Sequence, residues 1–189
     1  MPRNRQQIPR DERAGEVLAA ATDLFLKQGY AGTTIADISS ATGVARANVY
    51  WYFPSKDDVF AAVMDRMLTR EVRQLEHELQ GLDPLSVLVR GLAEMRTFRG
   101  LHQAMHERIP HSRAVREAHD RFLDWIRHLV EAAVDRQGER PDREMVADAA
   151  VALFEGTNAL EPAPRPAHEM IRWLLTTVLE PQSSGANRD

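Results

Sequence analysis

The sequence contains no cysteine among its 189 residues. Without thiols the chain can form neither a disulfide framework nor a thiolate metal site, and it has no cysteine nucleophile. It also lacks any run of about 18 apolar residues that could span a bilayer. Its first residues, MPRNRQQIPRDER, have no apolar stretch of the kind that forms a signal peptide. These absences predict a cytoplasmic protein that does not use a membrane.

The motifs of common enzyme classes are missing as well. We find no glycine-rich phosphate loop, no Gly-x-Ser-x-Gly and no His-Glu-x-x-His in the sequence. His102 and His106 lie four residues apart and would share one face of a helix, but Glu107 lies off that face. With seven histidines spread along the chain, such a spacing is expected by chance. We therefore expect no catalytic residue, no metal site and no cofactor.

Hydrophobic residues make up 43% of the chain, which excludes global disorder and provides a core for one or two domains. The net charge is −4, and the first 60 residues carry as many acidic as basic side chains. A protein that binds any polyanion would have a basic domain. If this chain binds nucleic acid, the charge balance favours a few placed phosphate contacts and sequence-specific recognition.

The segment Thr33–Lys56, TTIADISSATGVARANVYWYFPSK, begins with a helix-start signal. Thr34 lies three residues before Asp37, so its hydroxyl can accept from a backbone N–H while the carboxylate reaches back, as in a capping box. The spacing predicts a short helix over about 34–41. Gly43 then suits the left-handed position that follows a last helical turn.

A second short helix is predicted over about 45–52, and Pro54 prevents its continuation. Ser55 and Asp58 form the cap signal of the next helix. Two short helices around a tight glycine turn are a helix-turn-helix, whose second helix can lie in the major groove of DNA.

The second helix exposes side chains that suit nucleic acid better than water. Val44 and Val49 suffice to anchor it, so its large aromatic residues are not needed for packing. On a face in contact only with water they would expose apolar surface without a function. Arginine can pair with guanine, asparagine with adenine, and a tyrosine hydroxyl with a phosphate oxygen. We expect base contacts from Arg46 and Asn48. The expected phosphate or sugar–phosphate contacts come from Thr34, Tyr50, Trp51, Tyr52 and Lys56, and Tyr50 and Tyr52 have packing as the alternative role.

This stretch resembles the DNA-binding domain of the TetR family of bacterial transcriptional regulators. The resemblance covers about residues 10–60, and Ala45 and Ala47 depart from it where the family often has a small hydroxyl residue and a glycine. The matching residues are Ala20, Ala21, Leu24, Phe25, Gly29, Tyr30, Thr33, Thr34, Ile38, Gly43, Val44, Val49, Tyr50, Tyr52, Phe53, Ser55 and Lys56.

Helical periodicity extends along the rest of the chain, so the predicted fold class is all-α. A first helix ends at Gly29 and supports the helix-turn-helix, and an apolar stripe runs from Val59 to Leu79. The further expected helices span Leu85–Phe98, Leu101–Ile109, Ser112–Gly138, Arg143–Leu160 and Ala167–Leu179.

We therefore expect a three-helix head at 1–55, a six-helix body at 56–180 and a loose tail at 181–189. In the head, Arg3 and Arg5 belong either to an arm that reaches DNA or to a solubilising tail.

The resemblance implies that the body binds a small, largely apolar effector and forms a homodimer. Methionine and aromatic residues make adaptable pocket walls, although the same residues at helical spacing also build ordinary cores. The candidate effector residues are Met64, Met67, Met95, Phe98, His102, Met105, His106, Phe122, Trp125, Ile126 and Phe154.

The last two helices carry wide apolar faces, and in the family such helices pair with their symmetry mates in a four-helix interface. The alternative is burial within one subunit. The candidate interface residues are Val146, Ala149, Leu153, Met170, Ile171, Leu174, Leu175 and Val178.

The resemblance thus implies a ligand-relieved transcriptional repressor that binds a pseudo-palindromic, double-stranded operator as a homodimer. Two other hypotheses remain. One is an activator or a constitutive DNA binder, and the other is a ligand-binding helical protein with a vestigial helix-turn-helix. Arg46, Asn48, Tyr50 and Lys56 count against the last, because a vestigial head could have lost them.

Overall fold

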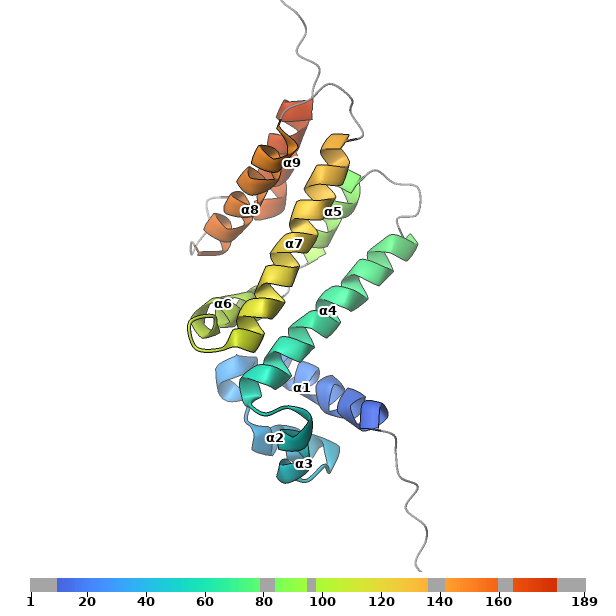
Figure 1. Ribbon diagram of the computed structural model, residues 1–189, viewed down its shortest axis with the longest axis vertical. Coiled ribbons are helices and arrows are strands. Elements are labelled where there is room, and N and C mark those ends of the chain that lie inside the picture. Colours follow the sequence, from blue (N-terminus) through green and yellow to red (C-terminus); the bar gives the residue numbers. More distant parts are fainter. Residues whose placement is uncertain (1–9, 79–83, 95–97, 136–141, 160–164, 180–189) are drawn as a thin grey trace, which may run out of the picture. The chain divides into compact units, whose positions relative to one another are not determined.

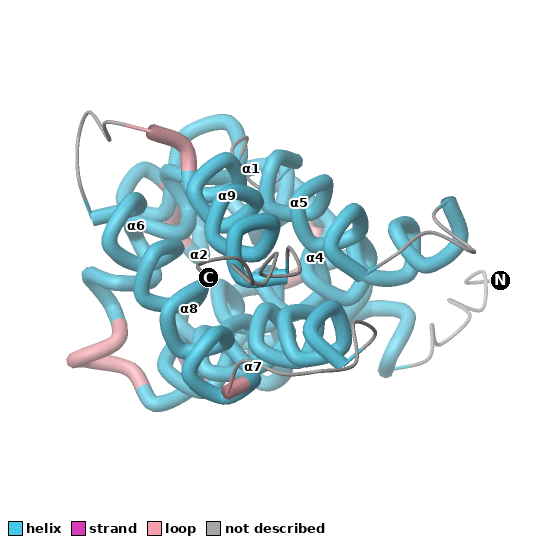
Figure 2. The backbone as a smooth tube through the Cα atoms, turned by 90° about the horizontal axis from the view of Figure 1, so that it is seen from above, coloured by secondary structure: helices cyan, strands magenta, loops and turns pink. Residues whose placement is uncertain are grey.

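The computed structural model describes residues 10–78, 84–94, 98–135, 142–159 and 165–179. Within these ranges the chain forms nine α-helices and no strand, which confirms the all-α prediction (Figures 1 and 2). No helix in the described part of the chain is both long and apolar enough to cross a membrane. The predicted Arg3/Arg5 arm, Met95 and the tail at 181–189 lie outside the described residues.

The helices follow the predicted order with small shifts at their ends. They are α1 Arg10–Gly32, α2 Ile35–Thr42, α3 Arg46–Tyr52, α4 Lys56–Glu78, α5 Pro84–Glu94, α6 Arg99–Arg108, α7 Arg113–Asp135, α8 Arg143–Ala159 and α9 Ala167–Leu179.

These helices form two compact units. The first comprises Met1–Glu71 and Thr97–Phe122, and the second comprises Val72–Arg96 and Leu123–Asp189. The first unit therefore contains more than the expected head, because it also includes the start of α4, all of α6 and the start of α7.

Local signals in the sequence explain the ends of the first two helices. Helical geometry is interrupted at Gly29, with φ 73° and ψ 173°, a conformation that only glycine adopts readily. One more turn leads to Gly32. The capping box of α2 forms as predicted, with Thr34 as the cap and Asp37 as its partner. Gly43 ends α2 in the left-handed conformation, also as predicted.

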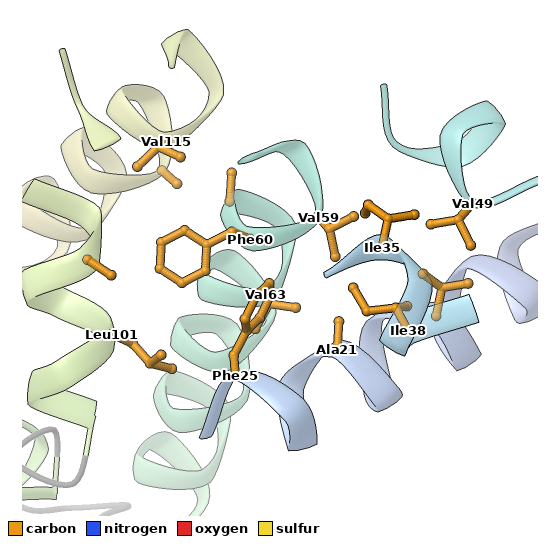
Figure 3. Packing of buried hydrophobic residues seen from close by; sticks show 14 of the residues in the cluster. Ala21, Phe25, Ile35, Ile38, Val49, Val59, Phe60, Val63, Leu101 and Val115 are labelled. Atoms are coloured by element: carbon orange, nitrogen blue, oxygen red, sulfur yellow. The ribbon is translucent and has the colours of Figure 1, made fainter. Parts of the chain in front are cut away.

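One hydrophobic core holds the first unit together and joins α1, α2, α3, α4, α6 and α7 (Figure 3). Phe25 and Phe60 meet edge to face, with ring centres 5.2 Å apart, and Leu101 of α6 lies beside them. Ile38 of α2 and Val49 of α3 are fully buried in the same cluster. Helix α6 therefore shares a core with α1 and belongs to the first unit.

In the second unit, α9 packs against both α5 and α8 (Figure 1). The side chains that close this packing are fully or almost fully buried. They include Leu88 and Leu92 on α5, Phe154 on α8 and Leu175 on α9. This unit thus has a core of its own, as independent domains do.

Gly43→Ala should lower the free energy of unfolding by about 1–2 kcal/mol, because an alanine in the left-handed region brings its Cβ against the following carbonyl. Gly100→Ala is the matched control, since Gly100 lies in α6 with open space around it and should be neutral or slightly stabilising. Urea denaturation of both variants measures the difference. Equal effects would show that the turn does not require its glycine.

Candidate nucleic-acid interface

The turn between α2 and α3 is fixed by three hydrogen bonds as well as by Gly43. The Ser39 hydroxyl donates to the Val44 carbonyl over 2.7 Å, and the Thr42 hydroxyl donates to the Ile38 carbonyl over 2.9 Å. The Val44 N–H donates to the Thr42 hydroxyl oxygen over 3.2 Å. These bonds satisfy backbone groups that a helix end leaves open and set the direction in which α3 leaves the turn.

Only one side chain of α3 is buried, and the others are available to a partner. Val49 is fully buried in the core, whereas Arg46 and Asn48 are exposed. Tyr50 and Trp51 are 50% and 61% exposed, which is unusual for such large apolar side chains. The helix therefore presents a continuous polar and aromatic face.

Tyr52 differs from the other aromatic residues of α3 because it is half-buried. Its ring meets Trp51 edge to face, with ring centres 5.0 Å apart. This position fits the alternative packing role of Tyr52, whereas Tyr50 is free of such a contact among the aromatic pairs of the described residues.

Arg10 is a candidate that sequence reasoning missed. Its guanidinium lies over the Trp51 ring, 4.4 Å from the ring centre, at the start of α1. A cation on an exposed aromatic face brings a positive charge to the edge of the α3 surface. The two residues are far apart in sequence, so no local pattern could reveal this pairing.

Thr34 is exposed, but its polar atoms are occupied. Its N–H and hydroxyl donate to the Asp37 carboxylate over 2.8 and 2.7 Å, and the Asp37 N–H donates back to the hydroxyl over 3.2 Å. These bonds, the hydroxyl contact first, hold the pKa of Asp37 below its ordinary value. Because Asp37 already supplies the negative charge at this helix start, it competes with the phosphate expected there.

Lys56 contributes to the structure in a way that its sequence position did not reveal. Its ammonium donates to the backbone carbonyls of Tyr30 and Thr33, both over 3.0 Å, and lies 3.9 Å from the centre of the Tyr30 ring. Burial lowers the pKa of Lys56, although the charge of Asp57 opposes the shift. Lys56 therefore ties the start of α4 to the α1–α2 connection, and a phosphate contact would compete with these bonds.

Asp57 extends this connection to α6. Arg108 donates to both carboxylate oxygens of Asp57, over 3.1 and 2.8 Å, and the Tyr30 hydroxyl donates to one of them. Burial alone would raise the pKa of Asp57, but the hydrogen bonds from Arg108 and Tyr30 and the nearby positive charges outweigh it, so the pKa lies below its ordinary value. We call Tyr30, Lys56, Asp57 and Arg108 the junction cluster.

The predicted effector residues are divided between the two units. In the first unit Met105 is a buried core residue, and Met64 and Met67 pack against the same core. His102 and Phe122 lie close together, with ring centres 5.9 Å apart, and Phe98 is half-buried. His106 contacts His102 and also a third histidine, His119 of α7.

The remaining effector candidates, Trp125, Ile126 and Phe154, belong to the second unit. Ile126 and Phe154 are buried there. Met64, Met67 and Met105 thus pack in or against the core of the first unit, the role that their helical spacing left open.

The predicted dimer residues divide into two groups. Val146, Ile171 and Leu175 are buried inside a single chain, so packing within the second unit leaves them no surface for a partner. Ala149, Leu153, Met170, Leu174 and Val178 are half-buried. Two residues outside the predicted set, Met145 on α8 and Trp173 on α9, are 67% and 68% exposed.

Asp57→Asn should lower the free energy of unfolding by about 1–2 kcal/mol at pH 7, because Arg108 loses a charged partner. A carboxyl with a depressed pKa in the folded state stabilises the protein above its unfolded pKa of about 3.9, and this contribution is lost as the pH falls through the lower folded value. The difference between wild type and variant, from urea denaturation, should therefore shrink as the pH falls from 7 towards 3.

The control for this series is Asp65→Asn, which breaks the more exposed pair between Asp65 and Arg121. Exposed pairs contribute only about 0–1 kcal/mol, so a smaller effect is expected. A difference for Asp57→Asn that does not change with pH would rule out the charged junction as its cause.

The segment that contains the helix-turn-helix matches a known protein family. Residues 17–63 match the family described as bacterial regulatory proteins, tetR family. The HTH-type transcriptional repressor Rv3405c of Mycobacterium tuberculosis is 36% identical over 91 residues, which cover 47% of this chain and 46% of that protein. The HTH-type transcriptional activator FasR of Mycolicibacterium smegmatis is 27% identical over 138 residues, covering 73% of this chain and 48% of that protein. The matches thus span a little under half the length of these curated relatives.

A solved structure has a similar fold over most of the chain. Thermus thermophilus FadR, a TetR-family transcriptional repressor crystallised in complex with lauroyl-CoA, has a TM-score of 0.67. The likeness covers 93% of this chain and 100% of that one at 20% identity, a level at which it shows the fold alone. Residues 17–63 contain the helix-turn-helix, and transcriptional regulators are among the relatives, so this segment is a domain of the tetR family of bacterial regulatory proteins.

Proposed function

We propose that the protein is a cytoplasmic, sequence-specific transcriptional regulator that binds double-stranded operator DNA through α3. The observation that carries the proposal is the exposed face of α3, where Arg46, Asn48 and Tyr50 project from a helix anchored by Val49. Arginine and asparagine are the side chains that read guanine and adenine in the major groove. We assign the chain no catalytic activity.

We further propose that it acts as a homodimer. A single α3 covers only a few base pairs, and two-fold symmetric regulators place two recognition helices in successive major grooves of a palindromic site. The exposed Trp173 of α9 and Met145 of α8 support an interface on these helices, because large exposed apolar side chains favour association. Half-buried Met170 and Leu174 would extend the apolar surface of α9.

The regulator is proposed to be a repressor that a small, largely apolar effector releases from DNA. Support comes from two relatives: Rv3405c is named a repressor, and Thermus thermophilus FadR is a repressor bound to lauroyl-CoA. An effector that fits one conformation better shifts the population towards it and changes the spacing of the two recognition helices. The second candidate is an activator, which the name of FasR favours.

The test is binding of the purified protein to short genomic fragments from around its own coding region. Fragment-specific binding that survives a rise in salt concentration supports a sequence-specific regulator. Weak binding that is equal on scrambled DNA and falls steeply with salt contradicts it. Release of a bound fragment by acyl-chain or other apolar compounds then tests the effector.

Arg46→Ala should weaken binding to the cognate site by about 1–3 kcal/mol and relax the preference at one base pair, because it removes a base contact. Arg113→Ala is matched in charge but removes an exposed arginine of α7 that pairs with Glu117. Fluorescence anisotropy with cognate and scrambled duplexes measures both variants. Equal losses on the two duplexes for Arg46→Ala would exclude Arg46 as a base reader.

Trp173→Glu should convert the dimer into monomers, because a carboxylate buried in an apolar interface without a partner costs several kcal/mol. The dimer dissociation constant should rise by more than roughly tenfold, and operator affinity should fall with it. Leu26→Glu is the control, since Leu26 is an exposed apolar residue of α1. Sedimentation velocity gives the oligomeric state, and an unchanged dimer for Trp173→Glu would move the interface elsewhere.

A further inference from the structure

Three histidines from two helices converge within the first unit. His102 and His106 lie one turn apart on α6, and His119 lies on α7. The ring centres of His102 and His106 are 4.6 Å apart, those of His106 and His119 are 4.9 Å apart, and those of His102 and His119 are 5.8 Å apart. The sequence alone shows only the pair on α6, because His119 lies on another helix and comes close to the pair only in the folded structure.

The geometry of this cluster is close to that of a metal site. One ring nitrogen from each histidine can be chosen so that all three lie within 4.8 Å of one another. Zinc–nitrogen bonds are about 2.0–2.1 Å, so three imidazoles around one tetrahedral ion have ring centres roughly 5 Å apart. The observed separations bracket this value.

The rings are also inclined rather than stacked. Their planes meet at 68° for His102 and His106, 43° for His102 and His119, and 73° for His106 and His119. Stacked rings would direct their nitrogen atoms to separate partners, whereas inclined rings can direct them to a common point. Edge-to-face rings are also the ordinary packing of aromatic pairs, so the inclination permits shared coordination without selecting it.

The surroundings provide both a shielded side and an open side. His102 and His119 are 8% and 6% exposed, and the Phe122 ring lies 5.9 Å from that of His102. His106 is exposed and gives an ion a path from solvent. The burial of His102 and His119 restricts the motion of two ligands, and the exposure of His106 lets an ion reach them from solvent.

We propose that His102, His106 and His119 bind one divalent transition-metal ion of the zinc class. Three imidazole ligands suit zinc, nickel, cobalt and copper, whereas magnesium and calcium require oxygen ligands. Three imidazole ligands are enough to hold one such ion. The chain has no cysteine, so the site offers nitrogen ligands without thiolate.

Metal binding at this place would join α6 to α7 across the short connection at 109–112. The unfolded chain does not hold these three side chains together, so an ion that binds only the folded arrangement stabilises it. The effect is independent of DNA and of any effector, and the proposal can therefore be tested apart from the proposed function.

The test uses the full-length protein, free of any affinity tag and stripped of metal with a chelator. Isothermal titration with zinc should show one ion per chain with a dissociation constant in the micromolar range or tighter, and the melting temperature should rise with zinc concentration. Cobalt should give the strong visible absorption of a tetrahedral site. Absence of saturable binding at one ion per chain, or a cobalt spectrum like that of the aqueous ion, would overturn the proposal.

Three single variants decide which histidines bind. His106→Gln removes an exposed ligand without disturbing the core and should weaken zinc binding roughly tenfold or more. His119→Gln should do the same, provided that its circular dichroism shows a folded protein. His111→Gln, in the connection between the two helices, should bind zinc as the wild type does.

Wild-type affinity in His106→Gln contradicts the site. A folded His119→Gln variant with wild-type affinity contradicts it equally, because His119 would then not be a ligand.

Discussion

The junction cluster ties the start of α4 to the α1–α2 connection and to the end of α6. Lys56 and Asp57 are neighbours in sequence and begin α4, but they hold different parts of the chain. Lys56 binds the carbonyls of Tyr30 and Thr33 near the end of α1, where the helix dipole favours a cation. Asp57 binds Arg108 at the end of α6 through both carboxylate oxygens. The charged groups of Lys56 and Asp57 are both partly buried. Removal of the partner of either group would therefore leave a charge with little hydration.

This junction matters because α3 has little stability of its own. It is seven residues long, and isolated helices of that length are unstable in water. Its only buried residue, Val49, and the hydrogen-bonded turn after α2 hold it in place. Keeping the anchor this small leaves Arg46, Asn48, Tyr50 and Trp51 exposed for recognition. The position of the exposed face of α3 therefore depends on how Val49 packs in the core.

Helix α6 connects the features of the first unit. It packs on α1, carries Arg108 of the junction cluster at its last turn, and carries His102 and His106 within the preceding two turns. A change in how α6 is held would therefore act directly on the contacts at the start of α4. This gives the first unit a physical route by which events at α6 can reach the helix-turn-helix.

The sequence by itself determined the local features. Helical periodicity predicted the all-α class and the order of the nine described helices. Thr34 and Ser55 define helix starts through bonds to near neighbours, and Gly43 ends α2 in the left-handed conformation. It also identified the exposed face of α3, because anchoring that helix required only Val44 and Val49. Such features depend on residues a few positions apart, which a linear pattern contains.

Tertiary structure decided what depends on distant residues. It gave Lys56 a structural role, brought Arg10 over Trp51, and buried Val146, Ile171 and Leu175 within one chain although their helical faces also suited a dimer. It also added His119 to the pair on α6, about one helix further along the chain. A periodic apolar face shows that a side chain will be buried, but only the packing of the whole chain shows against which neighbour.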